Sequence, residues 1–584
     1  MPANAKKNVP TCDNFRAVIR GGGYYVDKTQ FIERLIDATD MPTAFLFTRP
    51  RRFGKSMAMS MVASYFDCNA PAEDEKLFNG LYIANAEEKY RAEFHKYPVI
   101  ELTFVDSRCT TWQQAQDDLR GYLSFVCCRY KALRTSDKLD DDDKAKLRKL
   151  CNEESPFTSF KRTLSVLSEL LHKHYGQPAI ILIDEYDTPI RAAYEHGYYE
   201  EAIAFFRDFL CNGFKANDHL RFGILTGIMR IAKESIFSGL NNLIVDSVLD
   251  DEFADIFGFT QAEVNAMVEY YECADKLPLI KRWYDGYLFG TTEIYNPWSL
   301  TRYIAFRHKP AEAYWVNTAD NHQILDVIEK LPAHDRELVL DLLNAQEIES
   351  ELSLTMTFRD RCWRCKEVYG FLLMSGYLKA RRVGDSKRYL LSIPNYEVLQ
   401  MYQDEIVQHL ATEVNFSGID HMLKAVVQGD SVNFQEQLNE FMFHCSSFYD
   451  ITTGKSDDSL YECCYHNLVL GLMAGLMEDY MLRSNRESGL GRPDVLLVPK
   501  AQADLMPNCS ALATSGRLPV IVIEIKRPRE GENLKSAAQR ALLQAQEKRY
   551  GEDLSLGRTL LRYGIAFAGK EVALASEVRH QEAH

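Results

Sequence analysis

Two groups of residues in this chain have the types and the spacing that phosphate chemistry requires. The first is the basic segment Arg49–Ser56, which lies between an apolar run and a helical pattern. Backbone N–H groups at a helix N-terminus face an anion, and Gly54 lets the main chain approach it closely. Lys55 can reach the β- and γ-phosphates of a nucleotide, and the Ser56 hydroxyl can bind Mg²⁺. The segment therefore predicts a phosphate-binding loop for a purine nucleoside triphosphate, with ATP and Mg²⁺ as cofactors.

The residues of this phosphate loop that we expect to contact the nucleotide are Arg49, Pro50, Arg51, Arg52, Phe53, Gly54, Lys55 and Ser56. The usual pattern, G-x-x-x-x-G-K-[ST], begins with a glycine, and Arg49 stands in that place. Gly-Lys-Ser taken alone also fits an ordinary basic turn. A second motif is needed to decide between these interpretations.

The run AIILIDEYD supplies the second motif. A continuous apolar stretch that ends in Asp184 and Glu185 is typical of a buried parallel strand with acids at its C-terminal end, where α/β sheets bind ligands. We expect Asp184 to hold the magnesium shell and Glu185 to orient or polarise the attacking water. A third strand ends in Thr226, which can sense the γ-phosphate. Arg230 follows it and can supply positive charge in cis or across a subunit interface, which would imply a homo-oligomer; a structural role for both residues stays open.

The second group of residues lies near the C-terminus. Asp494 begins one predicted strand, and Glu524 and Lys526 stand two apart on the next, so they point to the same face. Two carboxylates and a neighbouring carbonyl are the hard-oxygen ligands that Mg²⁺ prefers. Lys526 can hold the attacking water or stabilise the pentavalent phosphate. The alternative is a plain Glu–Lys pair on an edge strand. Further candidates on the flanking helices are Glu462 as a metal ligand, Gln544 as a positioning residue and His466 as a hydrogen-bonded structural histidine.

The elements that must position these residues form two α/β units. Strand candidates at Thr43–Thr48, Val99–Phe104, Ala179–Ile183 and Phe222–Thr226 alternate with helices, which predicts a parallel sheet over residues 1–300. Residues 301–410 are predicted to be helical, and a hairpin around Gly384 makes a winged-helix module possible. Connecting helices over 411–440 lead to a smaller α/β unit over 441–584. The elements predicted there are a helix (Ser459–Leu482), strands (Asp494–Pro499, Pro519–Lys526, Leu561–Ala568) and a helix (Asn533–Tyr550).

These motifs resemble two known families. Over about residues 10–305 the chain resembles an AAA-ATPase-like domain. The resemblance rests on the segments RPRRFGKS, LIDEYDTPI, TGIMRIAKESIFSGLNNL, GGGYYVDKTQFIERLI and WYDGYLFG…IYNPWSL. In that family the first glycine of the phosphate loop is typically missing. Over about residues 440–575 the chain is similar to the PD-(D/E)XK nuclease superfamily. The similarity rests on Asp494, on Glu524-Ile525-Lys526 and on the segments YECCYHNLVLGLM and QAQEKRY. The resemblance implies a P-loop ATPase fold and a restriction-endonuclease-like α/β domain.

Composition limits the remaining functions. The net charge of −15 argues against non-specific nucleic-acid binding by the whole surface, but it permits a local basic groove. No apolar run reaches the ~20 residues that span a bilayer, and the N-terminus lacks the apolar core of a signal peptide. We therefore expect a cytoplasmic protein, not bound to membranes, with reduced cysteines. The leading hypothesis is an ATP-regulated or ATP-driven, Mg²⁺-dependent nuclease that acts on DNA or RNA, with DNA favoured over RNA as the partner. The alternative is a nucleotide-binding sensor or interaction protein whose nuclease-like domain binds without cutting; a transport or remodelling ATPase ranks last.

Overall fold

A computed structural model describes most of the chain. The described residues are 7–10, 12–39, 43–152, 155–215, 217–231, 236–237, 239–315, 342, 347–354, 365–402, 418–444, 458–477, 479–484, 488–500, 517–529, 531–555, 557–568 and 571–580. They divide into two compact units, one formed by Met1–Ala319 with Glu349–Glu397 and the other by Asp320–Ile348 with Val398–His584. None of the described helices combines the length and the apolar composition that crossing a lipid bilayer requires.

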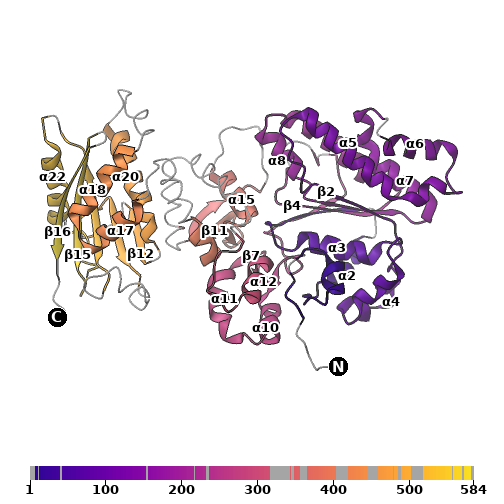
Figure 1. The fold of residues 1–584 in the computed structure, drawn as a ribbon, viewed down its shortest axis with the longest axis horizontal. Helices are drawn as coiled ribbons and strands as arrows, with labels where there is room; N and C mark the ends of the chain where they lie inside the picture. Colours follow the sequence, from indigo (N-terminus) through magenta and orange to yellow (C-terminus); the bar gives the residue numbers. More distant parts are fainter. Residues whose placement is uncertain are drawn as a thin grey trace. The chain divides into compact units, whose positions relative to one another are not determined.

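The first unit is built on a five-stranded parallel sheet in the order β2-β3-β4-β1-β5 (Figure 1). The strands are almost wholly apolar and buried, as expected where helices cover both faces. Their bounds are β1 Thr43–Thr48, β2 Val99–Thr103, β3 Ala179–Asp184, β4 Leu220–Gly227 and β5 Leu243–Asp246. The predicted parallel sheet is confirmed, and β5 is an additional strand on its edge.

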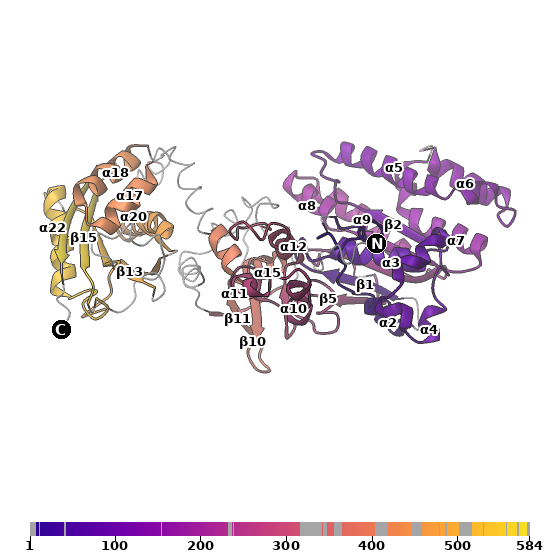
Figure 2. The ribbon, with the colours of Figure 1, turned by 60° about the horizontal axis from the view of Figure 1, so that its bottom comes forward.

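Helices lie on both sides of this sheet. Figures 1 and 2 show α2, α3 and α4 on one face and α5, α6 and α7 on the other. The helix bounds are α1 Phe15–Arg20, α2 Gln30–Asp37, α3 Lys55–Phe66, α4 Glu88–Arg91, α5 Trp112–Arg129, α6 Asp141–Cys151, α7 Thr163–Tyr175, α8 Thr188–Glu195 and α9 Tyr199–Phe214. Short 3₁₀ helices lie at Ala72–Phe78, Tyr82–Asn85, Lys131–Thr135, Phe157–Arg162, Ala274–Lys276 and, in the second unit, Ala474–Leu476.

The rest of the first unit is a small helical region with two three-stranded sheets, β6-β8-β7 and β10-β11-β9. Its elements are β6 Phe259–Thr260, α10 Gln261–Tyr270, α11 Leu277–Tyr284, β7 Tyr287–Phe289, β8 Thr292–Tyr295, α12 Pro297–Ala305, β9 Ile348–Glu351, α15 Cys365–Ser375, β10 Lys379–Arg382 and β11 Arg388–Ser392. Helix α15 is followed by the antiparallel pair β10–β11, so the predicted hairpin is confirmed, and the winged-helix module stays a prediction.

The second unit is a mixed sheet in the order β12-β13-β14-β15-β16, in which only β14 and β15 run parallel. Helix α22 packs on one face, and α17, α18 and α20 lie on the other (Figures 1 and 2). The bounds are α17 Ile419–Gln428, α18 Ser431–His444, α20 Asp458–Met473, β12 Tyr480–Ser484, β13 Val495–Pro499, β14 Val520–Lys526, α22 Leu534–Glu547, β15 Leu560–Ala568 and β16 Glu571–Arg579.

One predicted element of this unit is wrong in extent. The helix predicted over Ser459–Leu482 ends at Met473, and Tyr480–Ser484 is the edge strand β12. The segment pairs residue by residue with β13, from Tyr480 opposite Pro499 to Ser484 opposite Val495. Its ladder partners belong to β13, the next strand along the chain, so pairing between strands overrides a local apolar pattern that also suits a helix.

Candidate functional sites

The order of the strands brings the predicted phosphate loop to the predicted acidic residues. Strand β4 lies between β1 and β3, so the C-terminal ends of these three parallel strands meet at one edge. The phosphate loop follows β1, and the Arg49 N–H donates to the Gly227 carbonyl at the end of β4, at 3.1 Å. Gly54, with φ of +86°, is the N-cap of α3. This left-handed conformation costs glycine little and would strain other residues. The loop therefore directs the N-terminus of α3 toward the sheet edge at which Asp184 and Glu185 lie.

Asp184 ties the ends of β3 and β4 to the first turn of α3. The Ser56 hydroxyl donates to Asp184 Oδ2 at 2.6 Å, and the Thr226 hydroxyl donates to Asp184 Oδ1. Burial, followed by the negative charge of Glu185, raises the pKa of Asp184, and the two hydroxyl donors act in the opposite direction. Three residues that the sequence placed on separate elements are thus in direct contact.

Lys55 and Glu185 face each other beside this contact. The Lys55 side chain is only 3% exposed, and its Nζ lies 3.4 Å from Glu185 Oε1. The same ammonium group donates to the carbonyl oxygens of Arg49 and Pro50, both at 3.1 Å. Burial acts to raise the pKa of Glu185, but the charges of Lys55, Arg191 and Arg51 outweigh it and lower that pKa. Glu185 is therefore held as a carboxylate, with a φ of +54° that few non-glycine residues adopt.

Other side chains of the loop face the protein interior. Arg49 is fully buried, forms an ion pair with Asp246 at the end of β5, and lies over the ring of Phe257 at 5.2 Å. Phe53 packs edge-on against Tyr287, with ring centroids 4.8 Å apart. These contacts anchor the loop. The structure thus places the Arg49 guanidinium and the Phe53 ring away from Lys55 and Ser56, while the Arg49 carbonyl bonds Lys55.

Among the described residues, Arg52 and Arg230 form no hydrogen bond or ion pair with Asp184 or Ser56, and Arg52 packs on an aromatic ring instead. The Arg52 guanidinium carbon lies 4.3 Å from the centre of the Trp298 ring, a cation–π contact. Arg230 follows β4, and its buried Nε has no hydrogen-bond partner within the described part of the chain. Its predicted role, in cis or in a homo-oligomer, stays a prediction.

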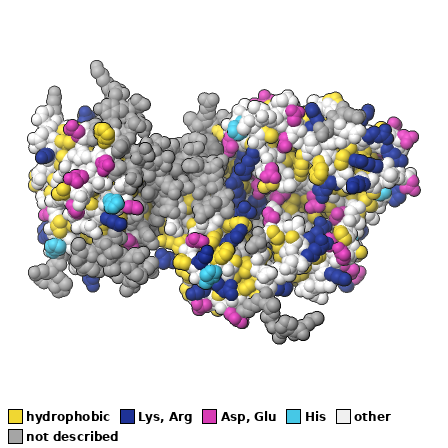
Figure 3. Space-filling model, in the orientation of Figure 1, with side chains coloured by type: hydrophobic (Ala, Val, Ile, Leu, Met, Phe, Trp, Pro, Cys, Tyr) yellow, Lys and Arg dark blue, Asp and Glu magenta, His cyan; other side chains and the backbone are white. Residues whose placement is uncertain are grey.

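Two residues that the sequence motifs did not indicate, Asp187 and Arg191, belong to this edge. Asp187 is buried and accepts the N–H groups of Ile228 and Met229, both at 3.2 Å. Arg191 on α8 lies with its Nε 3.7 Å from Asp187 Oδ2. Burial lowers the pKa of Arg51, and the positive charges of Arg191 and Arg108 lower it further. Several positively charged side chains are therefore close together at this edge. Figure 3 shows Lys and Arg side chains gathered where, in the orientation of Figure 1, the sheet edge lies between α8 and α15. Only the spacing of Asp187 and Arg191 after Asp184 could have indicated them.

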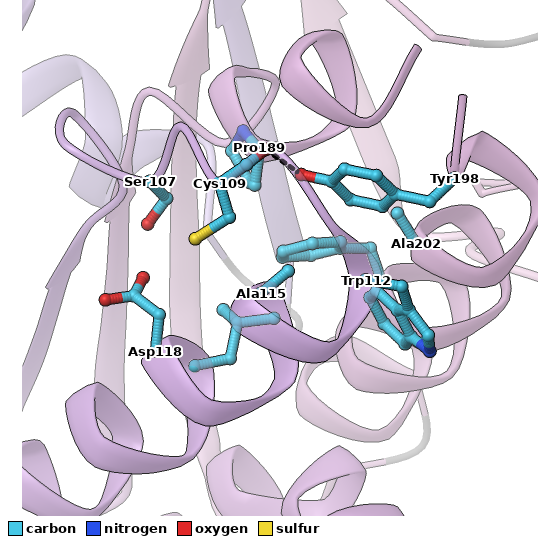
Figure 4. Close-up of a pocket in the computed structure, with 10 residues that line it drawn as sticks. Ser107, Cys109, Trp112, Ala115, Asp118, Pro189, Tyr198 and Ala202 are labelled. Atoms are coloured by element: carbon cyan, nitrogen blue, oxygen red, sulfur yellow. Dashed lines mark hydrogen bonds between the residues drawn. The ribbon is translucent and has the colours of Figure 1, made fainter. Parts of the chain in front are cut away.

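A small pocket lies among residues of α5, α8 and α9 (Figure 4). The Tyr198 hydroxyl donates to the Cys109 carbonyl at 2.6 Å and closes one side of it. The interior, which Trp112, Pro189 and Ala202 also line, holds about 10 Å³, room for about one water molecule. A nucleotide needs a cleft of several hundred Å³ (about 300–1,000 for ordinary ligands). This pocket is therefore too small to hold a nucleotide.

The second site forms where β13 and β14 begin to separate. Asp494 immediately precedes β13, and its Oδ2 accepts the Ile525 N–H at 2.7 Å. The Asp494 N–H in turn lies 3.4 Å from Glu524 Oε2. Lys526 Nζ donates to Glu524 Oε1 at 2.9 Å, and the Gln544 amide, from α22, donates to the same oxygen. The structure therefore brings together four of the residues that the sequence singled out.

Glu524 is the buried centre of this group. Its side chain is 1% exposed, and burial, followed by the charge of Asp494, raises the pKa of Glu524 to about 7, although Lys526 acts against the rise. A cation between two such carboxylates would relieve their repulsion, and carboxylate oxygen is the donor that Mg²⁺ prefers. Asp494 and Glu524 therefore fit a magnesium ion by their chemistry.

The other predicted ligands are less directly placed. His466 Nε2 lies 2.9 Å from the Asp494 carbonyl oxygen, the hydrogen-bonded arrangement expected of a structural histidine. Glu462 belongs to α20, and its side chain lies outside the described residues. Within the described part of the chain no group of three His, Cys, Asp or Glu side chains is close enough to hold a metal. A third protein ligand therefore stays a prediction.

Comparison with known proteins assigns these two regions. The family model described as a predicted AAA-ATPase matches residues 11–237, and that of the PD-(D/E)XK nuclease superfamily matches residues 460–577. The chain carries a predicted AAA-ATPase domain and a PD-(D/E)XK nuclease superfamily domain. It is also similar to an uncharacterised protein from the vnfD 5′ region of Azotobacter chroococcum mcd 1, with 29% identity over 414 residues that cover 68% of this chain and 69% of that protein.

The matched ranges agree with the observed elements. The AAA-ATPase match spans β1, β3 and β4 with all the residues around Asp184, and the nuclease match runs from α20 into β16. The sheet of the nuclease superfamily domain holds Asp494, Glu524 and Lys526 at adjacent strands. Both domains are thus present with their acidic residues at strand ends.

Proposed function

We propose that the AAA-ATPase domain binds and hydrolyses ATP with Mg²⁺, and that the nuclease superfamily domain hydrolyses phosphodiester bonds of nucleic acid, DNA before RNA, under the control of ATP. One observation carries this proposal: each domain brings two carboxylates and one lysine together beside the end of a buried strand. In the first domain these are Asp184, Glu185 and Lys55. In the second they are the carboxylates of Asp494 and Glu524 with Lys526.

In the ATPase domain the nucleotide would displace an existing ion pair. Lys55 now bonds Glu185 and two loop carbonyls, and the β- and γ-phosphates offer it stronger acceptors. Release of Lys55 leaves Glu185 ionised by the neighbouring Arg191 and Arg51 and free to orient the attacking water. Ser56 and Asp184, already bonded to each other, are the residues that would hold the nucleotide's Mg²⁺.

In the nuclease superfamily domain Asp494 and Glu524 would hold the metal. Mg²⁺ bound there would polarise the scissile phosphate and offset its charge. Lys526 shares the face of Glu524 and would orient the water or neutralise the phosphate as it changes geometry. Gln544 would keep the Glu524 carboxylate in one orientation, since its amide already donates to Oε1.

The second candidate function is a nucleotide-binding interaction protein whose nuclease-like domain binds without cutting. It is favoured by the pKa of Glu524, which leaves part of that carboxyl protonated at neutral pH, and by the net charge of −15. A protonated Glu524 is a poor metal ligand, because metals bind the deprotonated form.

ATP binding is tested by calorimetric titration of the full chain. We expect wild type to bind ATP with Mg²⁺ and Lys55→Ala to lose binding, because the lysine supplies the positive charge that faces the phosphates. Lys76→Ala, which removes an exposed lysine from the same domain, is the matched control and should bind as wild type. Equal affinity of wild type and Lys55→Ala would refute the phosphate-loop assignment.

Cleavage is tested with the full chain, Mg²⁺ and a panel of DNA and RNA substrates, each with and without ATP. The double variant Glu524→Ala/Lys526→Ala should lose cleavage, and the exposed pair Glu571→Ala/Lys535→Ala should keep it. Cleavage by wild type that survives in the first variant would place the chemistry elsewhere. Nucleic-acid binding with no cleavage on any substrate by wild type would favour the interaction protein.

A further inference from the structure

Trp315 is buried against the phosphate loop, although it lies outside the matched AAA-ATPase range. Its side chain is 1% exposed, and its indole Nε1–H donates to the Arg51 carbonyl at 3.0 Å. The Tyr377 ring packs beside it, with centroids 5.2 Å apart. At Gly376 an added Cβ would lie 2.9 Å from Pro50 Cβ and 3.3 Å from Trp315 Cη2, so indole, glycine and loop pack with no space between them. The indole therefore touches the loop by both packing and a hydrogen bond.

Glu397 fixes the main chain of Trp315. The carboxylate is fully buried and accepts the Trp315 N–H at 2.6 Å. It also accepts the Ser299 hydroxyl, at 2.8 and 3.1 Å, and Ser299 belongs to α12. Burying a carboxylate is costly unless hydrogen bonds satisfy it, and these donors satisfy both oxygens. The carboxylate thus joins Trp315 to α12.

The loop has a reason to need such support. Arg49 occupies the place where phosphate loops usually have a glycine, and contacts from other elements, with Asp246 and Trp315, hold residues 49–51. Lys55 bonds the carbonyls of Arg49 and Pro50, and Trp315 bonds the next one, that of Arg51. Three successive carbonyls of the loop are therefore held, two by the nucleotide-binding lysine itself. Of these three bonds, the one from Trp315 does not involve Lys55 and would remain when ATP draws Lys55 away.

We propose that Trp315 is a positioning residue of the nucleotide site: its indole N–H and ring hold the main chain of Pro50 and Arg51 in the ATP-binding conformation, and Glu397 holds Trp315. This inference rests on the proposed binding of ATP. It assigns a part in that binding to residues of the helical region, which no phosphate-loop motif contains.

The test compares ATP binding and steady-state hydrolysis by the full chain. Trp315→Phe keeps an aromatic ring and removes the N–H donor. We expect a roughly 3- to 10-fold higher Kd and KM for ATP, the loss of one hydrogen bond, with kcat changed less than KM. Trp112→Phe, on α5 and remote from the loop in sequence, is the matched control and should bind ATP as wild type.

A second pair of variants separates positioning from folding. Glu397→Gln keeps an oxygen that accepts the Trp315 N–H and should retain the wild-type KM, whereas Glu397→Ala should raise KM as Trp315→Phe does. Wild-type ATP affinity in both Trp315→Phe and Glu397→Ala would overturn the inference and leave the proposed ATPase standing. If wild type itself bound no ATP, the proposed function would fail first, and this inference with it.

Discussion

Replacing Glu524 by glutamine should stabilise the nuclease superfamily domain at pH 8 far more than at pH 5. Burial, and then the charge of Asp494, raises the pKa of Glu524 from 4.5 to about 7. A rise of that size corresponds to about 3 kcal/mol against the ionised form in the folded protein. Glutamine keeps the Oε1 acceptor for Lys526 and Gln544 and carries no charge at either pH.

The sign follows from proton binding. Between pH 4.5 and pH 7 the folded protein binds more protons at Glu524 than the unfolded chain does, so the free energy of unfolding falls as pH rises through this interval. The contribution of the neutral carboxyl is complete below pH 4.5 and lost above pH 7. The stability difference between Glu524→Gln and wild type should therefore widen by about 2.5 kcal/mol from pH 5 to pH 8.

Scanning calorimetry of the full chain measures this difference. For a unit of this size the change corresponds to a shift of roughly 5–10 °C in one unfolding transition. Glu571→Gln, which changes an exposed glutamate at the start of β16, is the matched control and should show no pH-dependent gap. A gap between Glu524→Gln and wild type that is equal at pH 5 and pH 8 would refute the electrostatic reasoning.

Four further predictions follow from other contacts. At pH 8, Mg²⁺ should raise the unfolding temperature of wild type more than that of Glu524→Gln, and equal rises by calorimetry would argue against a metal at this carboxylate. Asp246→Ala leaves Arg49 buried without its partner and should cost about 3–5 kcal/mol of stability in chemical denaturation. Gly564→Ala places a Cβ 2.3 Å from the main chain of α22 and should cost about 1–3 kcal/mol; an unchanged melting temperature would contradict that packing. Arg191→Met should lower kcat for ATP at least about tenfold, and an unchanged kcat would remove it from the catalytic group.

The sequence was sufficient for the parts of the fold that local chemistry determines. Thr43–Thr48 was predicted to the residue, and the contact of Ser56 with Asp184 follows from two motifs and the rule that ligands meet at the C-terminal ends of parallel strands. Strand β12 could not be found in the same way. Its five residues become a strand only by pairing with β13, and no local pattern distinguishes that outcome from a continuation of the helix.

The sequence also did not indicate the direction in which each side chain of a motif points. All eight residues of the phosphate loop were predicted to contact the nucleotide, yet Arg49 is paired with Asp246, almost 200 positions along the chain. Trp315 and Glu397 carry no motif at all, because their role depends on a hydrogen bond to a carbonyl, which any residue possesses. Contacts of this kind depend on tertiary structure and produce no recognisable spacing of residues in the sequence.

The two sites use the same pair of residue types in opposite electrostatic settings. Lys55 faces Glu185, and Lys526 faces Glu524, in each case with the carboxylate largely buried. The pKa of Glu185 is lowered, since burial is outweighed by Lys55 and two arginines. The pKa of Glu524 is raised, since burial and the charge of Asp494 outweigh its single lysine.

These opposite shifts indicate opposite ligands. A carboxylate surrounded by more positive than negative charge lies in a site prepared for an added anion, as the phosphates of a nucleotide are. A carboxylate repelled by a second carboxylate lies in a site that gains from an added cation. The two glutamates should therefore respond to different ligands. Raising the concentration of ATP should release Lys55 from Glu185, whereas raising the concentration of Mg²⁺ should remove the proton from Glu524. Proton release measured on adding Mg²⁺ at pH 6.5, and its absence in Glu524→Gln, would distinguish this electrostatic account from one in which both glutamates are only structural.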